Sequence, residues 1–318
     1  MNTTLLRTCG LAAAAVTILS TSTACNASPR SRQTSGAGAA SVTPTSSLRP
    51  APSPNRPSSG TVTSAAVSPA AAVRPAHVVV VVMENHSYAD VIGSSQAPYI
   101  NALARHGISL TRMYGITHPS EPNYLALFSG STHGLRDDRC PLTYSSANLA
   151  STLRARRYSF VGYSEGLPSV GSTICNYGAY ARRHAPWTDF TNLPGYVNRP
   201  LSTMPSDYSR LATVSFVVPN VNHDMHDGTV RQGDAWLQQH LDAYYRWART
   251  HNSLLVVTWD EDDHSASNQI PTVIVGAGVA VKRPSVHVDH YGLLRALEDT
   301  YGLPRLGYSA SAAPVPLH

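Results

Sequence analysis

Three apolar segments of this 318-residue chain each run into polar, titratable side chains. The segments are residues 78–82 (VVVVV), 214–218 (VSFVV) and 254–259 (LLVVTW). The side chains that follow are Glu84 and Asn85 after the first, Asp224, His226 and Asp227 after the second, and Asp260 and Glu261 after the third. Clustered carboxylates cannot all stay ionised in a low-dielectric site unless a cation compensates them. Carboxylate and amide oxygens beside histidine predict a divalent cation such as Mg, Ca, Mn or Zn; for each cluster alone, a solvated loop is the alternative.

A second reactive element is the stretch ITHPSEPNYL, residues 116–125. Pro122 suits the first turn of a helix, so Ser120 is expected just before a helix N-terminus. Free N–H groups and the helix dipole favour an anion there. A serine hydroxyl at that place could attack phosphorus, and a bound metal would lower its pKa. The alternative is that Ser120 only caps the helix.

Alternating apolar segments predict the elements that position these residues. Strand patterns lie at 78–82, 158–163, 214–218, 254–259 and 271–275, and helical patterns at 97–106, 125–128, 149–156, 236–244 and 293–301. This alternation favours an α/β domain with a mainly parallel central sheet. Ligands of such sheets bind outside the carboxyl ends of the strands, which is where the polar clusters fall.

The chain divides into three parts. Residues 1–25 form an export signal with a short apolar core, 26–76 a Pro/Ala/Ser-rich linker predicted to be disordered, and 77–318 the folded domain. Cys25 ends a lipoprotein-like cleavage box and would carry a lipid anchor; the alternative is ordinary signal cleavage and secretion. In an exported domain Cys140 and Cys175 are expected to form a disulfide, the alternative being two buried thiols.

The charge balance is mildly basic, at +5 with a sequence pI of about 9.1. This excess suits anionic substrates, but it is too scattered to indicate nucleic-acid binding. Six arginines could meet an acidic headgroup or form solvated faces: Arg112, Arg154, Arg156, Arg157, Arg182 and Arg183.

The motifs VVMENHSY, ITHPSEPNYLALFSGSTHG, PNVNHDMHDG, WDEDDH and DHYGLLRALEDTYGLP together resemble the phosphoesterase family of bacterial acid phosphatases and phospholipases C. The resemblance spans about residues 78–304. It implies an alkaline-phosphatase-like α/β/α sandwich. It also implies that Glu84, Asn85, Ser120, Asp260 and Glu261 bind metal, that Ser120 is the nucleophile, and that Asn123 orients the substrate or its loop.

For the remaining motif residues the resemblance implies less defined roles. His226 would stabilise the transition state or protonate the leaving group, with Asp224 and Asp227 near the site. His290 would touch phosphate or cap the last helix.

The expected function is that of an exported acid phosphatase acting on phosphomonoesters through a metal-assisted serine. Phosphatidylinositol 3-phosphate as substrate is implied by the resemblance alone. The alternatives are a phospholipase C-type phosphodiesterase, a serine esterase, which the missing G-x-S-x-G elbow disfavours, and a non-catalytic surface protein. The sequence fixes neither the metal, nor the oligomeric state, nor the general acid.

Overall fold

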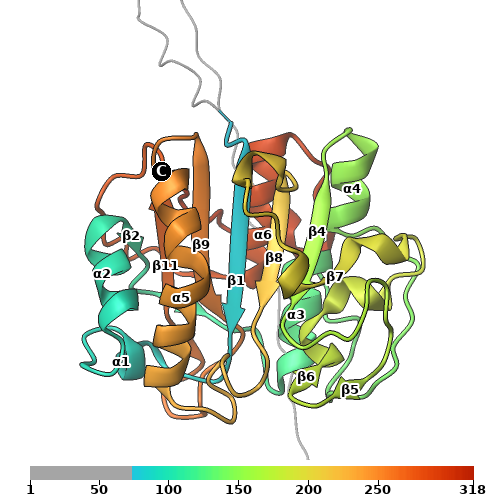
Figure 1. Cartoon of the computed structure of the whole chain (residues 1–318), viewed down its shortest axis with the longest axis horizontal. Coiled ribbons are helices and arrows are strands. Elements are labelled where there is room, and N and C mark those ends of the chain that lie inside the picture. The colour runs from blue at the N-terminus through green and yellow to red at the C-terminus, as the bar shows by residue number, and fades with distance from the viewer. Residues whose placement is uncertain (1–73) are drawn as a thin grey trace, which may run out of the picture. The chain divides into compact units, whose positions relative to one another are not determined.

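A seven-stranded, mainly parallel sheet forms the centre of the computed structural model, which describes residues 74–318 (Figure 1). Its strands, in spatial order, are β2 (Ile108–Ser109), β11 (Thr272–Gly276), β9 (Ser253–Trp259), β1 (His77–Met83), β8 (Val214–Val218), β4 (Phe160–Ser164) and β7 (Asn198–Pro200). The expected export signal, the lipid anchor at Cys25 and nearly all of the expected linker lie outside the described residues.

The centre of the sheet is β1, which is parallel to β8 on one side and to β9 on the other. Its five valines are at most 1% exposed. β-Branched side chains suit a strand covered on both faces, which explains the uninterrupted apolar run. Only β11 runs against the other strands, pairing antiparallel with both β9 and β2.

Helices cover both faces of the sheet. On one face lie α2 (Pro98–His106) and α5 (Val230–Ala248), and on the other α3 (Ser120–Ser129), α4 (Leu149–Ala155) and α6 (His290–Tyr301). In Figure 1, α5 lies in front of the sheet and α6 behind it. The described residues thus form the expected α/β/α sandwich, which is confirmed.

Local signals set the helix ends. The Thr229 side chain accepts the backbone N–H of Gln232 at the start of α5, and Asp289 accepts that of Gly292 at the start of α6. The helix α3 ends at Gly130, whose φ is 73°. A Cβ at this position would lie 1.9 Å from the carbonyl oxygen of Leu306, so only glycine fits.

Short elements complete the fold. They are helix α1 (Tyr88–Val91), the small sheet of β10 (Gln269–Ile270), β3 (Met113–Tyr114) and β12 (Val288–Asp289), the hairpin of β5 (Asn176–Tyr177) and β6 (Tyr180–Ala181), and the 3₁₀ turns η1 (Arg182–His184), η2 (Pro186–Asp189), η3 (Gly195–Val197), η4 (Leu201–Thr203), η5 (Tyr208–Arg210) and η6 (Gly307–Ala310). No helix within 74–318 combines the length and the apolar character needed to cross a membrane.

The first described residues are fixed at the amino end of β1. The Asn252 side chain donates to the carbonyl oxygen of Arg74 at 2.8 Å, and the backbone N–H of Ala76 donates to that of Asn252 at 2.7 Å. The Tyr301 hydroxyl donates to the carbonyl oxygen of Pro75 at 3.1 Å. The chain therefore enters the folded domain on the side of the sheet where the amino end of β1 lies.

Candidate active site

The polar clusters after β1, β8 and β9 meet at the carboxyl edge of the sheet, the lower edge in Figure 1. Backbone hydrogen bonds join them directly. The N–H of Glu84 donates to the carbonyl oxygen of Asp224 at 2.9 Å, and that of Asp260 to Met83 at 3.0 Å. Because neighbouring parallel strands end together here, three segments far apart in sequence form one site.

Ser120 lies within this cluster. Its hydroxyl donates to Glu84 Oε2 at 2.9 Å and lies 3.4 Å from Glu261 Oε1. Ser120 is the first residue of α3, and Pro119 holds the N-cap position. The expectation that Ser120 precedes the helix was therefore off by one residue, and Ser120 is not the N-cap. Its hydroxyl points to the carboxylates of Glu84 and Glu261, and Ser120 lies at the N-terminus of its own helix, α3.

Asn85 joins the first and third clusters. It has a positive φ of 43°, and its backbone N–H donates to Asp260 Oδ1 at 3.3 Å. One end of its side-chain amide lies 3.0 Å from Glu84 Oε2 and 3.3 Å from Asp260 Oδ1. As NH₂ this end donates to both carboxylates. As oxygen it forms a group of three acceptors, the arrangement of ligands around a cation.

Asn123 organises the loop that leads into α3. Its side-chain oxygen accepts the backbone N–H of Ile116 and Thr117, and its NH₂ donates to Glu261 Oε2 at 3.1 Å. Asn123 thus joins this loop to the Glu261 carboxylate. His118, which has no expected role, has its Nδ1 3.0 Å from the same Oε2 of Glu261.

The sequence did not reveal His184, which is 1% exposed at the end of η1. Its Nε2 lies 3.4 Å from Glu84 Oε1 and its Nδ1 lies 3.3 Å from Asp224 Oδ2. The Tyr124 hydroxyl donates to the same Glu84 oxygen. His184 stands outside every strand-end cluster, so no spacing signal pointed to it. Tyr124 stands in the quoted ITHPSEPNYL motif and could have been proposed from it.

The second cluster is split between interior and surface. Asp224 is buried and accepts the backbone N–H of His226 at 2.8 Å. The His226 ring is about a third exposed, lies 6.4 Å from the His184 ring, and has Nδ1 2.7 Å from Asp227 Oδ1. His226 therefore stands at the solvent side of the site.

His290 is buried at the start of α6, where Nε2 lies 2.5 Å from the backbone oxygen of Asp260. The cap of α6 is Asp289, so the alternative that His290 caps this helix is wrong. In this arrangement His290 holds the backbone that carries the Asp260 carboxylate.

Burial dominates the electrostatics of the acidic side chains at the site. Burial raises the pKa of Asp260 to about 7, that of Asp224 to about 7 and that of Glu261 to about 9. Burial also raises the pKa of Glu84, and the neighbouring Asp260 and Asp224 raise it further. Desolvation lowers the pKa of His184, which therefore stays neutral and able to act as a ligand.

These residues fit a divalent cation. Among the described residues no lysine or arginine forms an ion pair with Glu84, Asp224, Asp260 or Glu261. Asp260 Oδ2 and Asp224 Oδ2 are buried without a hydrogen-bond partner. Isolated buried carboxylates are costly, and a cation would compensate them. Glu84 is common to two donor sets: one with Asn85 and Asp260, and one with His184 and Asp224, whose ligand atoms all lie within 4.8 Å of one another.

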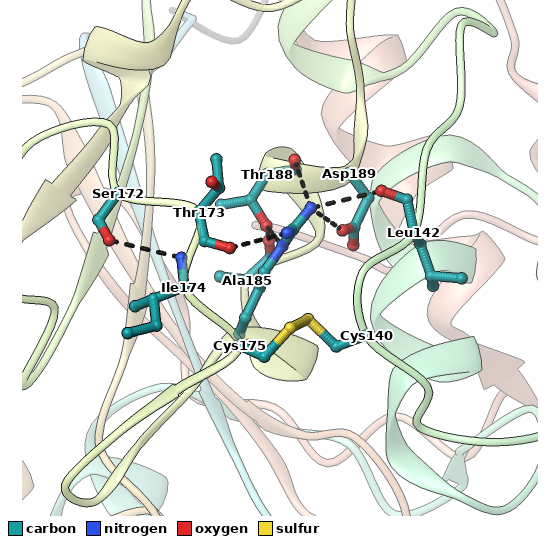
Figure 2. Close-up of a disulfide and its surroundings, with 10 residues drawn as sticks. Cys140, Leu142, Ser172, Thr173, Ile174, Cys175, Ala185, Thr188 and Asp189 are labelled. Atoms are coloured by element: carbon teal, nitrogen blue, oxygen red, sulfur yellow. Dashed lines mark hydrogen bonds and ion pairs between the residues drawn. A yellow bond between two sulfur atoms is a disulfide. The ribbon is translucent and has the colours of Figure 1, made fainter.

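A disulfide supports the segment that carries His184. Cys140 and Cys175 are bonded, as expected (Figure 2). The backbone N–H of Arg182 donates to the carbonyl oxygen of Cys175 at 2.9 Å, and the Arg182 guanidinium pairs with Asp189 Oδ1 at 2.8 Å. Burial raises the pKa of Asp189 to about 6 and that of its neighbour Glu121 to about 9. Glu121, Asp189 and Arg182 therefore connect the start of α3 to the disulfide.

Comparison with known proteins finds a family model and several relatives that match this chain. A family model described as "Phosphoesterase family" matches residues 94–304. A protein of Mycobacterium tuberculosis named phosphatidylinositol-3-phosphatase is 52% identical over 243 residues, which are 76% of this chain and 81% of the relative. An acid phosphatase of Aspergillus fumigatus is 28% identical over 250 residues, which cover 71% of this chain but only 54% of the fungal protein.

Among solved structures, a Vibrio parahaemolyticus protein in the alkaline phosphatase superfamily matches with a TM-score of 0.52 and 12% identity. The match covers 76% of this chain and 71% of that one. At this identity the likeness concerns the fold, and it confirms the expected alkaline-phosphatase-like architecture.

Proposed function

From the premise that this chain belongs to the phosphoesterase family, we propose that it is an exported acid phosphatase that cleaves phosphomonoesters with Ser120 as nucleophile. Phosphoester hydrolysis follows from the family and from relatives named phosphatases. The single observation that carries the finer proposal is the contact of the buried Ser120 hydroxyl with Glu84 Oε2 at 2.9 Å, at the N-terminus of α3.

The first chemical step follows from this contact. The Ser120 oxygen attacks phosphorus, and its proton passes to the carboxylate to which it already donates, Glu84. Glu84 is the proton acceptor in this proposal because its Oε2 already accepts the Ser120 hydroxyl at 2.9 Å. The N-terminus of α3 faces the negative charge of the phosphoryl group.

The bond from phosphorus to the leaving oxygen then breaks, and the alcohol takes a proton from His226 at the exposed side of the site. Water attacks the phosphoserine in the second step and gives a proton to His226. The bond from phosphorus to the Ser120 oxygen breaks, and Glu84 returns its proton to that oxygen, which releases phosphate and free Ser120. A divalent cation held by Glu84, Asn85, Asp260 and Glu261 would supply compensation for the phosphoryl charge and would lower the pKa of the Ser120 hydroxyl.

The substrate proposal rests on relatives. The Mycobacterium tuberculosis protein bears the name of a phosphatase for phosphatidylinositol 3-phosphate, and this supports a phosphoinositide as one substrate of this chain. The test is a panel of p-nitrophenyl phosphate, bis(p-nitrophenyl) phosphate, p-nitrophenyl acetate and phosphatidylinositol 3-phosphate, each with chelator and with metal added back.

Wild-type protein is expected to cleave the monoesters and to lose this activity with chelator. Ser120→Ala is expected to lower kcat by at least about 10⁴-fold, as loss of a catalytic nucleophile does, with an unchanged melting temperature. Preferential diester cleavage would support the phospholipase C-type alternative, and chelator-resistant cleavage of the acetate would support a serine esterase. Turnover of p-nitrophenyl phosphate by Ser120→Ala at the wild-type rate would eliminate the nucleophile.

We also propose export, followed by secretion or lipid attachment through Cys25. The pattern of residues 1–25 supports it, and so does the bonded pair Cys140–Cys175, because such bonds persist in oxidising compartments. Labelled palmitate in the wild-type protein but not in Cys25→Ser would establish the anchor. An unprocessed protein in the cytoplasm would rule out export.

A further inference from the structure

The structure places the six arginines that could meet an acidic substrate in different surroundings, and Arg112 is exposed directly before β3. Arg182 is 5% exposed and fully engaged with Asp189, Thr188 and Thr173. Arg154, Arg156 and Arg157 lie at or just after the end of α4, which leads into the start of β4. They therefore lie near the amino ends of the parallel strands, whereas Ser120 lies at the carboxyl ends.

Arg183 differs from these residues because its side chain has no partner among the described residues. It forms no ion pair, no side-chain hydrogen bond and no stacking with an aromatic ring there. Its side chain is half-buried, and its Nε is buried without a hydrogen-bond acceptor. A guanidinium has five N–H donors, so leaving a buried one unsatisfied is costly. An anionic ligand would satisfy it.

Arg183 is the neighbour of His184 in the chain. It is the middle residue of η1, a turn in which successive side chains point about 120° apart. Arg182 points to Asp189 beside the disulfide, and His184 points to Glu84 and Asp224. Arg183 takes neither of these directions, and its charge is one of the causes that lower the pKa of His184 and of Asp224.

The charge of Arg183 matters because the described part of the chain is neutral overall. All 19 Asp and Glu residues lie after position 73, whereas five of the 24 Lys and Arg residues lie before it, which leaves 19 basic side chains for 19 acidic ones. The +5 excess of the chain therefore contributes nothing within the folded part, and attraction of an anion to the acidic site depends on local cations.

We propose that Arg183 binds the non-bridging oxygens of the substrate phosphoryl group and thereby sets a preference for phosphomonoesters over phosphodiesters. This proposal rests on the proposed function. A monoester is close to a dianion at neutral pH and offers three terminal oxygens, two of which can accept from the guanidinium fork. A diester carries one negative charge on two terminal oxygens, and its second ester group occupies the place of the third.

The test compares full-length wild-type enzyme with Arg183→Gln, Arg183→Lys and Arg249→Gln. Arg249 is an exposed arginine at the end of α5, before the start of β9 and thus at the opposite sheet edge, so it is the matched control. The readouts are kcat and KM for p-nitrophenyl phosphate and bis(p-nitrophenyl) phosphate, the inhibition constant of inorganic phosphate, and the melting temperature.

Arg183→Gln is expected to lower kcat/KM for the monoester by roughly 10- to 100-fold, the range for a lost hydrogen bond to a charged group. It should weaken phosphate inhibition by a similar factor, and the diester should lose several-fold less. Arg183→Lys keeps the charge without the fork and should lose less than Arg183→Gln. Should Arg183→Gln fail to fold, the Lys variant carries the test through its ratio of monoester to diester activity.

Two negative results have different meanings. A wild-type enzyme without activity on either ester would refute the proposed function. An active wild type, together with an Arg183→Gln enzyme that keeps the wild-type ester ratio and phosphate inhibition, would overturn the role of Arg183 and leave the proposed function standing.

Discussion

The buried Asp260 carboxyl group predicts how removal of the cation changes stability. In the metal-free protein its pKa is raised from 3.8 to about 7 by burial. The folded state therefore keeps this proton over a range in which the unfolded state has lost it, and the free energy of unfolding falls as pH rises through that range. A shift of about 3 pKa units corresponds to about 4 kcal/mol, of which about 3 kcal/mol falls between about pH 4.5 and 7.5.

The assay is urea unfolding followed by tryptophan fluorescence, at both pH values, with chelator and with divalent metal. Chelated wild type should lose about 3 kcal/mol at the higher pH through Asp260, and Asp224, shifted in the same direction, adds to this loss. Metal at about 1,000 times its dissociation constant should restore about 4 kcal/mol, since it binds only the folded site.

Two variants isolate the contribution of this carboxyl group. Asp260→Asn should reduce the pH dependence by the part due to Asp260, about 3 kcal/mol, and lose the stabilisation by metal. Asp207→Asn, at a fully exposed carboxylate whose pKa is lowered by Ser209, should retain both. The reasoning is refuted if chelated wild type is equally stable at the two pH values, or if metal stabilises Asp260→Asn as much as wild type.

Two further predictions concern the proton donor and the disulfide. His226→Ala should reduce the rate of the first, alcohol-releasing step by about 10²- to 10⁴-fold for alkyl phosphates but much less for p-nitrophenyl phosphate, whose leaving group needs no protonation; equal losses in that step on both substrates, measured in single turnovers, would exclude His226 as the general acid. Replacing both Cys140 and Cys175 by serine opens a loop with a sequence separation of 35. This should lower the free energy of unfolding by about 3–4 kcal/mol in urea titrations, and an unchanged unfolding midpoint would contradict the loop-entropy argument.

The sequence predicted the central strands well, because a strand covered on both faces needs an unbroken apolar run. The run 214–218 coincides with β8, and 78–82 lies within β1. Strand direction was not predictable in this way, since burial alone does not distinguish a parallel strand from the antiparallel β11. The two-residue strands β3, β5 and β12 are too short to carry any periodic pattern.

The site was predictable where its residues directly follow buried strands. Glu84, Asp224 and Asp260 meet because neighbouring parallel strands end at one edge. His184 enters from an irregular segment fixed by Arg182, Asp189 and a disulfide. Such convergence depends on tertiary contacts between loops, and no local pattern of residue types encodes it.

The docking of residues 74–76 at the amino end of β1 has a practical consequence for handling the enzyme. A fusion partner or resin linked ahead of residue 74 joins the folded unit on the side remote from Ser120. Protein immobilised in that way would present its catalytic edge to the solution, so bulky substrates such as vesicles could be offered to it without obstruction from the support.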